Sequence, residues 1–230
     1  MDVHGEMGTA TDTLRGPAGK GRLPRGLMAS IALMVLMVLP LPRWLVPGLG
    51  LDAQVGREIV YWLMAAAILL FVRFIERRPL ISIGLAPVGW KSLLFGILGG
   101  MITVAGMAFI YLVIYPALGM SSNESQLTDI QALPAWFRIM LVARAGVFEE
   151  ILYRGFMIER LNEALKWRWL AALISFAAFT LAHLDYWGWA HLLIAGFGGA
   201  VLTLLYLWRR DLGCNMFAHI FTDAVGFLAG

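Results

Sequence analysis

The sequence predicts an all-α fold, a polytopic bundle of about seven (six to eight) transmembrane helices. Two observations carry this prediction. First, 60% of the 230 residues are hydrophobic and only 14% are charged, a composition far more apolar than that of a soluble domain of this length. Second, apolar runs of roughly 20 residues, long enough to cross a hydrocarbon core, recur along almost the whole chain. We therefore expect one membrane domain, residues 27–230, in a bacterial plasma membrane.

The apolar runs divide the chain into expected spans and loops. The spans lie at about residues 27–46, 58–75, 91–115, 136–160, 169–186, 190–208 and 212–229. Residues 1–26 are glycine-rich, non-periodic and basic toward their end, which predicts a flexible tail. Lys and Arg are concentrated in alternate loops, and cytoplasmic loops are the ones enriched in these residues. We expect the tail in the cytoplasm and the C-terminus on the opposite side.

The distribution of charge and the absence of repeats argue against two classes of function, nucleic-acid binding and transport by inverted repeats. The net charge of +3 does not indicate nucleic-acid binding, because the cations lie at helix ends and in loops rather than along one stripe. Gly96 with Gly100, and Gly196 with Ala200, have the spacing of close helix packing. No internal repeat is visible, which argues against a transporter built from inverted repeats.

The fourth expected span has one polar face. On an α-helix Glu149, Glu150 and Arg154 fall on the same side. Glu150 and Arg154 are four residues apart, the spacing at which a carboxylate and a guanidinium meet, so we expect an ion pair on one helix. Glu149 is then left without a partner. A carboxylate inside a membrane is unfavourable by several kcal/mol, so an unpaired one indicates function.

Two further spans carry polar stripes at four-residue intervals. The fifth has Ser175, Phe179 and His183, and the seventh has Asn215, His219 and Asp223. Three such stripes should face one another around a buried wet cavity, because each would otherwise expose hydrogen-bonding groups to lipid. A glutamate, two histidines and an aspartate in a cavity of low dielectric are the groups needed to activate water. This arrangement favours hydrolysis.

The segments "EEILYR" at 149–154, "FTLAH" at 179–183 and "HIFTD" at 219–223 together resemble the three motifs of the CAAX prenyl endopeptidase and bacteriocin-processing (CPBP) family. The resemblance covers about residues 134–227. It implies an intramembrane endopeptidase in which Glu149 and His183 position the attacking water and His219 with Asp223 serves the oxyanion. Glu150, Arg154 and Phe179 would support them.

Asp223 departs from the family pattern, which typically has asparagine there. An ionised carboxylate cannot donate a hydrogen bond to an oxyanion. Asp223 must therefore be protonated, orient His219 or bind a metal, and the sequence leaves these three roles open.

A divalent metal is one of two options for the mechanism. Glu149, His183 and His219 would supply a zinc site of two histidines and a carboxylate with one open position. The usual His-Glu-x-x-His signal of zinc proteases is missing from the sequence. A metal-free glutamate mechanism uses the same residues, so both options stay open.

Partners and alternative functions follow from the same residues. We expect the protein to contact the lipid bilayer and a membrane-associated peptide or protein substrate; nothing marks a prenyl-binding groove, and the oligomeric state is open. One alternative is a non-enzymatic membrane partner, an immunity or scaffold protein of the same family. The other is a proton-coupled transporter in which buried acids and a histidine relay protons, namely Glu149, Glu150, His183 and Asp223.

Overall fold

The computed structural model describes residues 25–121 and 124–228, and every regular element in these ranges is a helix. The all-α prediction is therefore confirmed. Nearly all of the predicted flexible tail, residues 1–26, lies outside the described ranges. The elements are α1 (Arg25–Val38), α2 (Leu41–Leu45), η1 (Val46–Leu49), α3 (Ala53–Leu70), η2 (Phe71–Ile75), η3 (Leu80–Ile83), α4 (Trp90–Phe109), η4 (Ile110–Ile114), α5 (Tyr115–Leu118), α6 (Glu124–Gln131), α7 (Ala135–Arg144), η5 (Ala145–Met157), α8 (Ile158–Leu165), α9 (Arg168–Ala182), α10 (Leu184–Trp187), α11 (His191–Arg209) and α12 (Leu212–Leu228).

Fewer helices than predicted qualify as candidate membrane spans. In the described part of the chain, four helices are long and apolar enough to cross a membrane, at residues 53–75, 90–118, 168–187 and 191–209. A fifth is formed if α1 and the segment 41–49, which meet at a 65° bend, count as one span. The predicted count of about seven is not confirmed. Residues 135–165 form a helical rod that carries too many charges to count as an apolar span, and α12 has only 17 residues.

The outer surface of the bundle is apolar, as lipid contact requires. Large hydrophobic side chains on separate long helices are strongly exposed, among them Leu63 (63%), Leu112 (70%) and Leu173 (59%). A soluble protein rarely exposes so much contiguous apolar surface. Together with the spanning helices, this surface makes the chain an integral membrane protein.

A proline and two aspartates set the ends of three helices. Pro40 follows α1, and it cannot continue the hydrogen-bond ladder of that helix, so the chain bends there. Asp52 caps α3 by accepting hydrogen bonds from the backbone N–H groups of Gln54 (2.9 Å) and Val55 (3.1 Å). Asp211 caps α12 in the same way, through the N–H of Cys214 at 3.1 Å.

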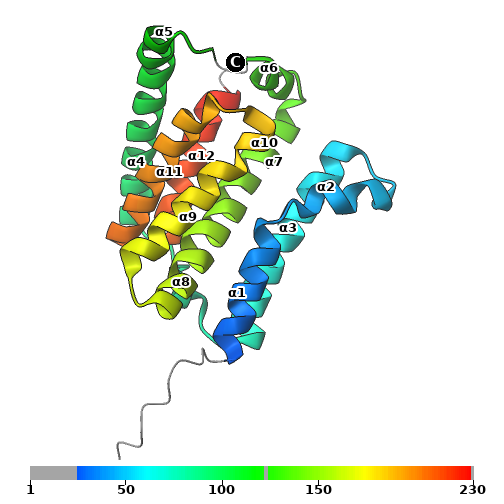
Figure 1. The fold of residues 1–230 in the computed structure, drawn as a ribbon, viewed down its shortest axis with the longest axis vertical. Helices are drawn as coiled ribbons and strands as arrows, with labels where there is room; N and C mark the ends of the chain where they lie inside the picture. Colours follow the sequence, from blue (N-terminus) through cyan, green and yellow to red (C-terminus); the bar gives the residue numbers. More distant parts are fainter. Residues whose placement is uncertain (1–24, 122–123, 229–230) are drawn as a thin grey trace, which may run out of the picture.

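The rod of α7, η5 and α8 lies at the centre of the molecule (Figure 1). It has α1 and α3 on one side, and α9 and α12 on the other, with α4 and α11 beyond them. Eleven of the 13 residues of η5 are buried. A Cβ atom on Gly146 would lie 2.4 Å from Ile220 Cγ1, so only glycine allows η5 to approach α12 this closely.

The central segment η5 is a π-helix, which has consequences for the side chains on it. In a π-helix the backbone hydrogen bonds join residues i and i+5, and such segments occur frequently at functional sites. Residues five apart are therefore stacked above one another. In an α-helix, with 3.6 residues per turn, they would be about 140° apart.

The two predicted small-residue contacts have different outcomes. A Cβ atom on Gly96 would lie 2.7 Å from the carbonyl oxygen of Cys214, and one on Gly100 would lie 2.8 Å from the ring of Phe221. Close packing of α4 on α12 is confirmed at both positions. At Gly196 the nearest atom would be Thr180 Cγ2 at 3.7 Å, an ordinary contact, so the packing of Gly196 does not require glycine.

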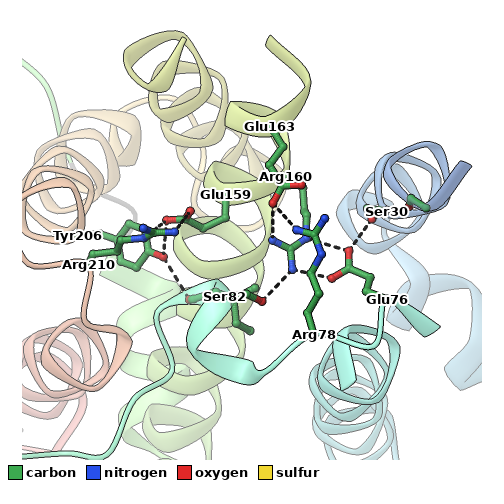
Figure 2. A network of polar contacts seen from close by, with 11 residues as sticks. Ser30, Glu76, Arg78, Ser82, Glu159, Arg160, Glu163, Tyr206 and Arg210 are labelled. Carbon is green, nitrogen blue, oxygen red and sulfur yellow. Dashed lines mark hydrogen bonds and ion pairs between the residues drawn. The ribbon is translucent and has the colours of Figure 1, made fainter. Parts of the chain in front are cut away.

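Charged residues of α8 tie the helix ends together at one end of the bundle (Figure 2). The guanidinium of Arg160, only 1% exposed, donates to Glu76 after η2 and to Ser82 of η3. Glu159 accepts hydrogen bonds from Tyr206 (3.0 Å) and Arg210 (2.9 Å) at the end of α11. These contacts hold Glu76, Ser82 and Arg210 against α8 and so fix the loops at this end of the central rod.

Candidate active site

Glu150 is the centre of a fully buried polar cluster. Its side chain is 0% exposed and pairs with Arg154 at 2.8 Å, as the four-residue spacing predicted. It also accepts hydrogen bonds from Asn215 Nδ2 at 3.0 Å and from the ring of His219 at 2.9 Å. Arg154 further donates to the carbonyl oxygen of Gly199 at 3.2 Å. Glu150 is thus a structural anchor that joins η5 to α11 and α12.

The contact with Glu150 requires a proton on one ring nitrogen of His219. Glu150 is ionised because it pairs with a guanidinium, so it can only accept hydrogen bonds. The contacting atom of His219, Nδ1, must therefore carry a proton. The other ring nitrogen, Nε2, faces two acids: it lies 4.0 Å from Glu149 Oε2 and 3.6 Å from Asp223 Oδ2. The reactive edge of this imidazole is thus turned to Glu149 and Asp223.

Glu149 is not unpaired, so that prediction was wrong. Its Oε1 accepts a hydrogen bond from Arg144 Nη1 at 3.1 Å. The physical reason is the π-helix, in which a residue lies above the one five positions earlier. The α-helical periodicity assumed from the sequence places Arg144 on another face. Arg144 also donates from Nε and Nη2 to both oxygens of Glu58 in α3, at 3.0 and 3.1 Å.

The neutralisation of Glu149 is nevertheless incomplete. One guanidinium serves two carboxylates, so the trio of Glu58, Arg144 and Glu149 has a net charge of −1 when both acids are ionised. The two N–H groups on one edge of Arg144 go to Glu58, and only one goes to Glu149. The second oxygen of Glu149 is left to face His219. Glu149 is therefore the less completely paired of the two adjacent glutamates.

Phe179 connects the two histidines. The centroid of its ring lies 4.7 Å from that of His183 and 6.1 Å from that of His219, and the guanidinium of Arg154 lies 4.0 Å above it. His183 Nδ1 lies 2.8 Å from the carbonyl oxygen of Phe179, which can only accept, so Nδ1 is the protonated nitrogen. The ring of His183 also stacks on His191, at 6.1 Å between centroids.

The structure brings most of the predicted site together. Side chains from η5, α9 and α12 meet as the three stripes required: Glu149, Glu150, Arg154, Phe179, His219 and Asp223. Within residues 25–121 and 124–228, no hydrogen bond joins His183 to Glu149; the histidine facing Glu149 is His219. The sequence reasoning missed Arg144 and Glu58. Both were charged residues inside expected spans, which is a signal that they pair.

The candidate ligands Glu149, His183 and His219 are not arranged as a metal site. In the described residues, no group of three or more His, Cys, Asp or Glu side chains is arranged to hold one. Glu149 Oε1 is bound to Arg144 and His219 Nδ1 to Glu150, so each of these residues has only one donor atom facing the other. The residues as they lie do not fit a zinc site.

Comparison with known proteins identifies the segment that carries this site. No curated protein and no solved structure matches the chain. Residues 131–225 match the family described as type II CAAX prenyl endopeptidase, Rce1-like. The match contains all three motifs and leaves out Glu58 and the helices before residue 131. The segment at residues 131–225 is therefore similar to the Rce1-like type II CAAX prenyl endopeptidase family, as the three motifs suggested.

Proposed function

We propose that this protein is an intramembrane endopeptidase that hydrolyses a peptide bond in or next to the bilayer, with Glu149 as the base that activates water. One observation carries the proposal: Glu149 Oε2 and His219 Nε2 face each other at 4.0 Å, while the other oxygen of Glu149 is bound to Arg144. This separation is too long for a direct hydrogen bond and suits one small polar group between the two atoms. A substrate water fits that description.

The chemistry follows from these positions. Glu149 accepts a proton from the water as the water oxygen forms a bond to the carbonyl carbon of the peptide. The carbonyl oxygen gains the negative charge, and a proton on His219 Nε2 stabilises it by a hydrogen bond. When the C–N bond breaks, Glu149 returns its proton to the leaving amine. Burial of the site strengthens each of these interactions, because little water screens them.

Asp223 takes one of the three roles that the sequence left open, the orientation of His219. Its Oδ2 lies 3.6 Å from His219 Nε2, on the same edge of the ring as Glu149. We propose that Asp223 orients His219 and favours a proton on Nε2, where an asparagine would instead donate directly to the oxyanion. His183, which contacts Phe179 and His191, has no step in this scheme.

The substrate we propose is a peptide anchored in the membrane. The name of the matching family points to CAAX-type peptides, which carry a prenyl group on the cysteine. A prenylated CAAX-type peptide and its non-prenylated counterpart are therefore the first probes, each presented in proteoliposomes. Cleavage of the prenylated peptide that falls by about 10²- to 10⁴-fold in Glu149→Gln supports the proposal. Normal turnover by that variant, correctly folded, overturns it.

We also propose that the basic end of the bundle faces the cytoplasm, with the N-terminus on that side. Loops at this end carry Arg77, Lys166 and Arg210, and loops at the other end carry Asp52 and Asp185. A membrane-impermeant thiol reagent applied to intact cells should label Gln54→Cys and not Lys166→Cys. Labelling only of the second variant would reverse the orientation. The native Cys214 does not interfere, because it is 0% exposed.

The transporter alternative is not favoured by the site. It needs Glu150 to release and accept protons, but Glu150 is fully buried and held by Arg154, Asn215 and His219. A carboxylate with three donors is stabilised in its ionised form. It therefore suits an anchor better than a relay.

A further inference from the structure

We propose that Arg144, held by Glu58, is a positioning residue for the reaction: the pair fixes the carboxylate of Glu149 with Oε2 turned to His219. The inference rests on the proposed function of Glu149 as the base. It adds two residues that lie outside the family motifs, and Glu58 lies outside the matched segment altogether.

The geometry of the guanidinium carries the first step. Arg144 donates to the two oxygens of Glu58 from Nε and Nη2, at 3.0 and 3.1 Å. Two parallel hydrogen bonds fix the plane of a guanidinium as well as its place. The remaining terminal nitrogen, Nη1, is thereby aimed, and it holds Glu149 Oε1 at 3.1 Å. With one oxygen held, the other oxygen of Glu149 is directed to His219, at 4.0 Å from Nε2.

Packing on α3 strengthens this arrangement. The guanidinium of Arg144 lies 4.6 Å from the ring centroid of Tyr61, which is three residues after Glu58 on the same helix. The side chains of Arg144 and Glu58 are only 11% and 6% exposed, so solvent screens their attraction little. Tyr61 in turn contacts Phe148, next to Glu149, at 5.2 Å between ring centroids. Helix α3 thus packs against Arg144 and against the residue next to Glu149, and these contacts help to hold the base in place.

A purely structural bridge between α3 and α7 would need only the bidentate contact between Glu58 and Arg144. The third donor, on Glu149, is what connects this bridge to the site. The distinction can be tested, because a reversed pair can rebuild the bridge but places a carboxylate, not a guanidinium, at position 144, five residues before Glu149.

The experiment compares variants in proteoliposomes with the prenylated CAAX-type peptide, measuring kcat, KM and thermal unfolding. We expect Arg144→Lys and Glu58→Gln to lower kcat roughly 10- to 100-fold, because a small displacement of a catalytic group has effects of this size. KM should be unchanged, since neither side chain is proposed to touch the peptide. Arg78→Lys, the same change in a pair with Glu163 at the far end of the bundle, is the control and should keep the wild-type kcat.

The double variant Glu58→Arg with Arg144→Glu separates the two roles. Under our proposal it regains thermal stability relative to Arg144→Glu alone, while kcat stays low. Recovery of kcat together with stability would show a bridge and nothing more, and would overturn the proposal. A wild-type kcat in Arg144→Lys would overturn it as well.

An infrared measurement keeps the inference testable apart from activity. The carboxylate band of Glu149 is isolated by subtracting the spectrum of Glu149→Gln from that of the parent protein. We expect this band to shift when Glu58→Gln is introduced, because the hydrogen bond from Arg144 changes. An unshifted band contradicts the positioning role even if no peptide is cleaved, whereas absent cleavage with a shifted band counts only against the proposed function.

Discussion

Replacement of Glu150 by glutamine tests whether this residue anchors the bundle. The carboxylate accepts from three donors: Arg154 Nη1 at 2.8 Å, His219 Nδ1 at 2.9 Å and Asn215 Nδ2 at 3.0 Å. In Glu150→Gln the amide oxygen can keep two of them, but the amide NH2 then faces a third donor. The variant also leaves the guanidinium of Arg154, which is 0% exposed, without a counter-charge.

The loss of stability follows from that unpaired charge. Removing one partner of a buried ion pair lowers the free energy of unfolding by about 3–5 kcal/mol. For a chain of 150–250 residues, roughly 2–4 °C of unfolding temperature is lost per kcal/mol, so a decrease of about 6–20 °C is expected. Asp185→Asn is the matched control: it makes the same chemical change in a pair with Arg43 whose side chains are 80% and 71% exposed. Such pairs contribute at most about 1 kcal/mol.

The assay is thermal unfolding of the purified variants in detergent, followed by circular dichroism at equal protein concentration. Glu150→Gln should unfold well below the wild type, and Asp185→Asn close to it. If both variants unfold at the wild-type temperature, the buried cluster does not hold the helices together, and the division of roles between the two glutamates is wrong.

Three further predictions concern packing, the network at the helix ends and metal. Gly96→Ala should lower the free energy of unfolding by about 1–3 kcal/mol, because the added Cβ would lie 2.7 Å from a backbone carbonyl oxygen. Gly196→Ala, whose Cβ would lie 3.7 Å from its nearest neighbour, should leave stability unchanged. Equal unfolding temperatures of the two variants would contradict the packing of α4 on α12. Arg160→Gln should lower the free energy of unfolding by about 3–5 kcal/mol in the same assay, because it leaves the buried carboxylate of Glu76, whose side chain is 3% exposed, without its guanidinium partner. An unchanged unfolding temperature would show that the network in Figure 2 does not stabilise the fold. Excess chelator should leave peptide cleavage unchanged, and elemental analysis should find no stoichiometric zinc; activity that is lost on chelation and restored by zinc would refute the metal-free step.

Local spacing predicted part of the site correctly. The pair of Glu150 and Arg154 follows from a four-residue separation, which brings side chains together on helices of ordinary pitch. The convergence of three polar stripes follows from the need to bury hydrogen-bonding groups away from lipid. Both arguments need only composition and periodicity, which the sequence displays.

The contact between Arg144 and Glu149 was not predictable in this way. It depends on the π-helical turn of η5, and the sequence reasoning assumed the ordinary 3.6-residue period. The pairing of Arg144 with Glu58 depends in addition on which distant helix packs against α7, and periodicity carries no information on that.

The count of about seven spans is not confirmed, partly because the expected fourth span, residues 136–160, does not qualify as a membrane span by its composition. The rod of α7, η5 and α8 carries Arg144, Glu149, Glu150 and Arg154, so its average hydropathy is low. These charges are compensated within the bundle, by each other and by Glu58. A rule that counts apolar residues along one helix cannot register compensation that is made between helices.

The most direct test of the account is the rate at which Glu149→Gln cleaves the prenylated CAAX-type peptide, measured beside its thermal unfolding. This change leaves Arg144 paired one to one with Glu58, so the fold should keep its stability. We predict a wild-type unfolding temperature and a rate reduced by about 10²- to 10⁴-fold, the usual contribution of a general base. A stable Glu149→Gln protein that cleaves at the wild-type rate would contradict the central claim that Glu149 activates the water.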